Sequence, residues 1–110
     1  MPHIAIKGLD ENSVANVSKT LPAALVPIVG GSPSSVLIQH IPAKFYVDGV
    51  ESVTPPVIVQ VDTQPRPQEV LDAFAETLAS VLRPYTKQDI EIYFICNSID
   101  LYYHNGKHIS

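Results

Sequence analysis

The spacing of apolar residues predicts two strands around a helix in the first half of the chain. A short apolar strand over residues 4–7 ends at a glycine. Asp10 then offers a side-chain acceptor for a helix N-terminus. The apolar residues that follow recur at spacings of three or four, on one helical face: Val14, Val17, Leu21, Leu25 and Ile28. Pro22 and Pro27 remove backbone donors from this helix, so we expect a kink or a break near residue 21. A second strand follows over 35–42.

The second half of the chain repeats this order of elements. β-branched residues predict a strand over 57–61. An apolar stripe predicts a helix over 68–82, and a further apolar strand follows over 90–95. A shift of 54 residues lays 2–6 on 56–60, and the strands that end each half align under the same shift without a gap. The chain is therefore an internal repeat of one strand–helix–strand unit.

Two dipeptides predict tight turns outside these units. Asp48-Gly49 lies in a loop with short extended pieces between the second and third strands. Asn105-Gly106 lies between the short apolar and aromatic segments at the end of the chain, which is a strong hairpin signal.

Two strand–helix–strand units predict an α+β fold, in one domain over 1–110 with repeat halves of about 1–54 and 55–110. The strands should form a four-stranded mixed sheet with two helices on one face. The third and fourth strands are apolar on both faces, so the second face of the sheet needs another cover. A copy of the same chain is the simplest cover, and the pattern predicts an oligomer. A ferredoxin-like small-molecule-binding domain is an alternative fold.

Composition and charge exclude several partners. The formal net charge is −4 and the lysines and arginines are scattered, which argues against a nucleic-acid partner. No apolar run reaches the roughly 18 residues of a membrane span, and no signal peptide is recognisable, so we expect a cytoplasmic protein without membrane contact. Cys96, the one cysteine, is expected to be a buried thiol. The histidines lack metal-ligand spacing, and neither a metal nor a cofactor is expected.

The strongest candidate for chemistry is Pro2. Methionine aminopeptidase removes Met1 when the next residue is small, and removal would leave Pro2 with a free secondary amine at the head of a strand. Burial disfavours the charged form of an amine and lowers its pKa, which would make Pro2 a base or nucleophile near neutral pH. The alternative is that Pro2 serves only processing or the start of the strand.

These features together resemble the tautomerase superfamily, in particular its double-length members with the macrophage migration inhibitory factor-like fold. The shared features are the doubled unit, Met1-Pro2 before a short apolar strand, Pro56 at the restart of the repeat, and the polar turn over 32–34. The aromatic tail over 101–108 and the segment over 45–49 are most similar to an uncharacterised bacterial branch of that superfamily. The resemblance covers essentially the whole chain.

The resemblance implies a homotrimer with a pocket at each subunit boundary. It also implies an isomerase of the tautomerase type, with Pro2 as the general base in keto–enol tautomerisation of a small carbonyl compound, which could carry a carboxylate. Five further residues are candidates for substrate binding, each with a solvated or structural role as the alternative: Lys7, His40, Lys44, Tyr46 and Tyr102.

The chain also departs from the pattern of that superfamily. The migration inhibitory factor group has a lysine just ahead of the second strand, whereas this chain has no cation over 30–33. On the fourth strand, where that group has a tyrosine and an asparagine, Ile90, Ile92 and Phe94 share a face and cannot donate a side-chain hydrogen bond. These departures favour an alternative function, a non-enzymatic oligomeric small-molecule-binding module that kept the fold and lost the chemistry.

Overall fold

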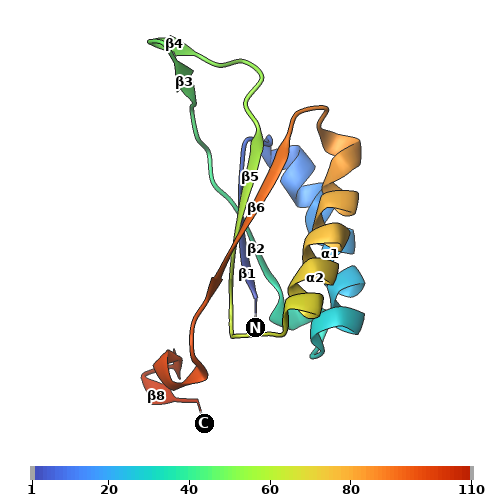
Figure 1. Ribbon diagram of the computed structural model, residues 1–110, viewed down its shortest axis with the longest axis vertical. Coiled ribbons are helices and arrows are strands. Elements are labelled where there is room, and N and C mark those ends of the chain that lie inside the picture. The colour runs from blue at the N-terminus through green and yellow to red at the C-terminus, as the bar shows by residue number, and fades with distance from the viewer. Residues whose placement is uncertain (1, 110) are drawn as a thin grey trace.

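A mixed sheet forms one layer of the molecule, and two helices form the other (Figure 1). The computed structural model describes residues 2–109. The strands are β1 His3–Lys7, β2 Leu37–His40, β3 Tyr46–Val47, β4 Val50–Glu51, β5 Val57–Thr63, β6 Ile90–Cys96, β7 Tyr103–His104 and β8 Lys107–His108. The helices are α1 Glu11–Val29 and α2 Gln68–Leu82, with short 3-10 turns at Pro33–Ser35, Arg83–Tyr85 and Ile99–Leu101.

The four long strands lie in the order β2-β1-β5-β6. β1 pairs with β2 in parallel and β5 with β6 in parallel, whereas β1 and β5 are antiparallel neighbours at the centre. Each half of the chain therefore supplies one parallel pair, and the two halves run in opposite directions. This arrangement confirms the α+β fold, with a four-stranded mixed sheet and both helices on one face.

The core lies between the helices and one face of the sheet. Alternate residues of β1 and β5 point to this face, and apolar residues of both helices meet them. The fully buried side chains are Ile4, Ile6, Val17, Leu21, Leu25, Val57, Val59, Val61, Phe74, Leu78 and Leu82. Phe74 of α2 and Phe94 of β6 pack edge to face, with ring centroids 5.3 Å apart. Such aromatic pairs stabilise beyond the area that they bury.

The opposite face of the sheet is open and mixes polar with apolar side chains. Leu37, Tyr93 and Ile95 are exposed there by 60%, 57% and 43%. The register places His3 beside Leu37 on β2 and beside Asp62 on β5, so charged and polar groups interrupt the apolar area. This face is therefore less uniformly apolar than the sequence pattern indicates.

The first helix differs from its expected form. α1 continues from Glu11 to Val29 as one helix, with both prolines inside it. Pro22 and Pro27 leave the carbonyls of Ser18 and Ala23 without their usual donors. Both of those residues are exposed, so water can satisfy the carbonyls, while the apolar face of the helix stays packed on the core. We expected a kink or a break near residue 21; the break was wrong, and the kink stays a prediction.

The N-terminus of α1 confirms Asp10 as the cap. Its carboxylate accepts a hydrogen bond from the backbone N–H of Ser13 at 2.7 Å. Hydrogen bonding from the side chain of Ser13, and then from its backbone N–H, lowers the pKa of Asp10, because it stabilises the charged form.

Gly8 joins β1 to the cap of α1 at a point where the two halves of the chain touch. It has a φ of +91°, and a Cβ at this position would overlap the backbone carbonyl of Pro56, which directly precedes β5. Only glycine combines this conformation with so close an approach.

Two small hairpins extend from the body of the molecule at opposite ends (Figure 1). Asp48 and Asn105 have φ angles of 50° and 52°, and each is followed by a glycine with positive φ, as type I′ turns require. Both hairpins expose apolar side chains, including Val47 and Tyr103. Both predicted turns are confirmed.

Two further expectations can be compared with the described residues. Cys96 is exposed at the end of β6, so the expectation of a buried thiol was wrong. Neither α1 nor α2 combines the length and apolar character that crossing a bilayer requires.

Candidate functional site

A cavity of about 610 Å³ lies at the end of the sheet where the chain begins. It is bounded by the first residues of β1 and β2, the last residues of β5, and the segment that follows β6. The lining residues are His3, Leu37, Asp62, Thr63, Gln64, Asn97, Ser98, Ile99, Leu101, Tyr102 and Ile109. Apolar side chains of the C-terminal segment form much of the wall, with neutral polar groups between them.

Pro2 directly precedes β1, and the next residue, His3, is part of the cavity lining. Pro2 is buried, and its carbonyl oxygen accepts a hydrogen bond from the backbone N–H of Leu37 at 3.0 Å. Parallel pairing of β1 with β2 therefore fixes Pro2 beside two lining residues. Met1 lies outside the described residues, so its removal stays a prediction.

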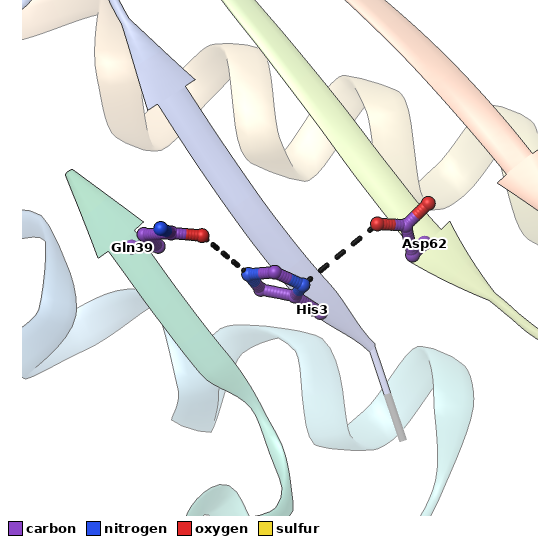
Figure 2. Close-up of polar contacts among 3 residues, drawn as sticks. All are labelled: His3, Gln39 and Asp62. Carbon is purple, nitrogen blue, oxygen red and sulfur yellow. Dashed lines mark hydrogen bonds and ion pairs between the residues drawn. The ribbon is translucent and has the colours of Figure 1, made fainter. Parts of the chain in front are cut away.

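A row of polar side chains crosses β2, β1 and β5 (Figure 2). Nε2 of His3 donates to Oε1 of Gln39 at 2.7 Å, and Nδ1 of His3 lies 3.7 Å from Oδ2 of Asp62. Since Nε2 carries the donated hydrogen, Nδ1 of a neutral ring presents only a lone pair to the carboxylate. His3 therefore compensates the charge of Asp62 only when the ring is protonated.

Arg66 lies two residues after Gln64 of the cavity lining, and Lys107 lies two residues before Ile109. Nε of Arg66 donates to Oγ1 of Thr63 at 3.0 Å, and its Nη1 donates to the carbonyl of Val29 at 3.3 Å. Val29 is the last residue of α1, where a helix carries partial negative charge. The guanidinium is thus bound to the end of α1 and is not part of the cavity lining.

The C-terminal segment is folded against the same end of the sheet by its own hydrogen bonds. The backbone N–H of Asn97 donates to the carbonyl of Thr63 at 2.9 Å, which extends the contact between β5 and β6. Oγ of Ser98 accepts from the N–H of Asp100 at 3.2 Å and caps the turn that follows. The N–H of Ile109 donates to the carbonyl of Tyr102 at 3.0 Å and closes the hairpin. These bonds position Tyr102 in the wall.

The structure brings together only part of the expected site. Of the five candidates for substrate binding, Tyr102 lines the cavity beside Pro2. Lys7 is the last residue of β1, and His40 pairs with Ile6 at the same far end of the sheet, where its Nε2 donates to the carbonyl of Leu9 at 2.9 Å. The roles of these residues stay predictions.

A second cavity, of about 360 Å³, lies at that far end. Its lining residues are Gly8, Leu9, Ala43, Lys44, Phe45, Glu51, Ser52, Val53 and Pro55. Lys44 is part of this lining, and Tyr46 is exposed on the β3–β4 hairpin above it. Lys44 and Tyr46 are thus separated from Pro2 by the length of the sheet within one chain.

Several residues of the first cavity were not singled out from the sequence. Asp62, Thr63 and Gln64 directly follow the expected third strand, and Asn97 and Ser98 follow the expected fourth strand. Because parallel strands end at the same edge of a sheet, this placement was a usable signal. Within residues 2–109 no cluster of three or more histidine, cysteine or acidic side chains is arranged to hold a metal ion.

Comparisons with known proteins place the chain in a family. The model of the family described as "Domain of unknown function (DUF1904)" matches residues 1–108. A search of curated proteins found no match. A solved structure of a DUF1904 domain from Sebaldella termitidis ATCC 33386 has 24% sequence identity and a TM-score of 0.92, covering 99% of this chain and 100% of that chain.

Two further solved structures relate the fold to known proteins. A macrophage migration inhibitory factor-like protein from Entamoeba histolytica has 12% identity and a TM-score of 0.73, with 98% of each chain covered. A malonate semialdehyde decarboxylase has 13% identity and a TM-score of 0.69, covering 93% of this chain and 89% of that chain. The chain therefore belongs to the DUF1904 family, and its fold is that of the tautomerase superfamily.

Proposed function

We propose that this chain is a keto–enol tautomerase of a small carbonyl compound, with the amine of Pro2 as the general base. The observation that supports this most is the place of Pro2. It is buried at the head of β1, directly before His3, which lines a cavity of about 610 Å³ that is large enough for a small ligand. Removal of Met1 would turn its nitrogen from an amide into a basic secondary amine.

The chemistry requires one proton to move from carbon to oxygen. In this proposal Pro2 takes a proton from the carbon next to the carbonyl, which leaves an enolate, and the protonated amine then returns the proton to the oxygen. Burial of Pro2 disfavours its ammonium form and so lowers the pKa of the amine, which keeps it unprotonated near neutral pH. Asn97, Ser98 and Tyr102 supply the cavity with side-chain donors that can stabilise the enolate oxygen.

Alkylation of the N-terminus tests this function directly. The full chain is treated near pH 7 with 3-bromopyruvate and, separately, with the uncharged bromoacetone, and is then analysed by intact mass and peptide mapping. We expect a mass without Met1 and one adduct on the N-terminal peptide, because an unprotonated amine reacts and an ammonium does not. Cys96 is an exposed competing thiol, so the experiment uses a Cys96→Ser background.

Retention of Met1, or a free Pro2 that neither reagent modifies, would remove the base from the proposal. The alternative function, an oligomeric binding module without chemistry, would then be preferred. The observation that favours this alternative concerns β6. Its residues Ile90, Ile92 and Phe94 pack towards the helices and bring no side-chain hydrogen-bond donor to a site.

We further propose that the chain forms a homotrimer through the open face of the sheet. Tyr93 and Ile95 are exposed on this face, and a copy of the chain would bury them. Light scattering of the full chain should give a mass of about three times 12.0 kDa. Tyr93→Glu should shift the protein towards monomer, because it places a charge in the contact, whereas Thr20→Glu on the exposed side of α1 should not. A monomeric or dimeric wild type would contradict the trimer.

A further inference from the structure

Charge is unevenly distributed in the cavity beside Pro2. Among its lining residues, Asp62 and His3 are the titratable groups apart from Tyr102, and within residues 2–109 no lysine or arginine lines it. The side chain of Asp62 is 34% exposed. Its one described ionic contact is His3 at 3.7 Å, which compensates the carboxylate only when the ring is protonated. A neutral imidazole therefore leaves a net negative charge in the wall.

Arg66, which lies two residues after Gln64 of this wall, does not offset that charge. Arg66 donates two hydrogen bonds, to Oγ1 of Thr63 and to the carbonyl of Val29 at the end of α1. Turning the guanidinium into the cavity would break both bonds and leave the helix terminus without its cation. The net charge of −4 on the whole chain adds a field that repels anions before they arrive.

The rest of the lining is apolar or neutral. Leu37, Ile99, Leu101 and Ile109 offer hydrocarbon surface, and Thr63, Gln64, Asn97 and Ser98 offer neutral hydrogen-bonding groups. An uncharged ligand with an apolar body and a single carbonyl can satisfy such a lining. A carboxylate would lie near the like charge of Asp62 without a cation to pair with, which is costly in a partly desolvated site.

We infer that the cavity takes uncharged carbonyl compounds and discriminates against carboxylates, with Asp62 as the residue that excludes the anion. The inference rests on the proposed function in one respect: an unprotonated Pro2 contributes no positive charge of its own. It narrows the substrate class of the same site to neutral aldehydes and ketones.

Equilibrium binding of two inert probes tests this inference without any reaction at Pro2. Phenylacetamide and phenylacetate have nearly the same shape and differ by one charge. Each is titrated at pH 8 into the full chain labelled with ¹⁵N, and the dissociation constant is taken from the amide signals of Asn97, Ile99 and Leu101. We expect phenylacetamide to bind about tenfold more tightly than phenylacetate, as one unfavourable charge contact predicts.

Matched variants identify the residue responsible. Asp62→Asn keeps the shape of the side chain and removes its charge. It should bring the two dissociation constants within about twofold, because that charge is the expected cause of the roughly tenfold preference. Asp48→Asn makes the same change of net charge in the turn of the far hairpin, where the φ of 50° suits asparagine, and should leave the preference unchanged.

Equal or tighter binding of phenylacetate by the wild type would overturn the inference. Loss of that binding in Arg66→Gln would then identify Arg66 as a cation that turns into the site. Failure of both probes to shift the cavity signals would equally overturn it, since the cavity would not take a neutral aromatic carbonyl compound. None of these outcomes depends on alkylation of Pro2, so the binding preference and the proposed catalysis can fail separately.

Discussion

Replacing Pro2 with alanine should lower proton abstraction from phenylacetone by roughly 10²–10⁴-fold, the range typical of removing a general base. The assay follows exchange of the α-hydrogens for deuterium by NMR. Alanine is small enough for Met1 still to be removed, so the variant keeps a free amine. That amine is primary and lacks the ring that the start of β1 holds in place. The loss should therefore appear mainly in kcat, because the base acts in the chemical step.

Two controls separate the amine from the proline ring. Pro56→Ala changes the proline at the matching start of the second repeat, whose nitrogen lies within a peptide bond, and should leave exchange unchanged. An uncleaved residue added ahead of Pro2 keeps the ring and converts the amine into an amide, and it should abolish exchange as fully as Pro2→Ala. Undiminished exchange in the extended protein would exclude Pro2 as the base.

Gly8→Ala should destabilise the fold by about 3 kcal/mol or more. A left-handed conformation costs a residue with a Cβ roughly 1–2 kcal/mol. Here the Cβ would also overlap the carbonyl of Pro56, so the backbone at the start of β5 has to move. A loss of this size is a large part of the stability of a small domain, which is typically about 5–15 kcal/mol. Urea denaturation followed by circular dichroism measures it as a fall in the transition midpoint.

Gly49 offers a matched control for this substitution. It has a φ of +78°, and a Cβ there would meet no atom within 4 Å. Gly49→Ala therefore introduces the strain of a left-handed alanine without the overlap, and should cost about 1 kcal/mol. The difference between the two variants measures how tightly the halves of the chain are packed at Gly8. Equal effects would mean that the backbone at Pro56 yields freely.

The secondary structure could be predicted from the sequence wherever the apolar pattern and the local residue preferences agreed. The apolar stripe of α2 placed that helix at Gln68–Leu82, as observed. α1 could not be placed as well, because Pro22 and Pro27 indicate a break on local grounds. Packing of four buried residues on that helix outweighs the missing hydrogen bonds, and this balance is visible only in three dimensions.

The candidate site was less predictable, because its residues are far apart in sequence. Asp62 and Ser98 line one cavity with His3 only through the register of three strands and the return of the C-terminal segment. Lys7 and Lys44 are candidates for substrate binding from the sequence, because charged and loop residues are easy to recognise there. The direction of β1 places Lys7 at the opposite end of the sheet from Pro2, which the type of residue alone does not indicate.

The two cavities are related by the internal repeat. The shift of 54 residues that aligns the halves also aligns most of their lining: Gly8 with Asp62, Leu9 with Thr63, Ala43 with Asn97, Lys44 with Ser98, Phe45 with Ile99 and Pro55 with Ile109. The molecule thus has two related cavities, and only the one at Pro2 can acquire a free N-terminal amine. The described lining of the second cavity lacks a chain terminus, so that lining is not constrained by a role for one. The charges of the two linings differ: the second cavity has Gly8 where the first has Asp62, and Lys44 where the first has Ser98.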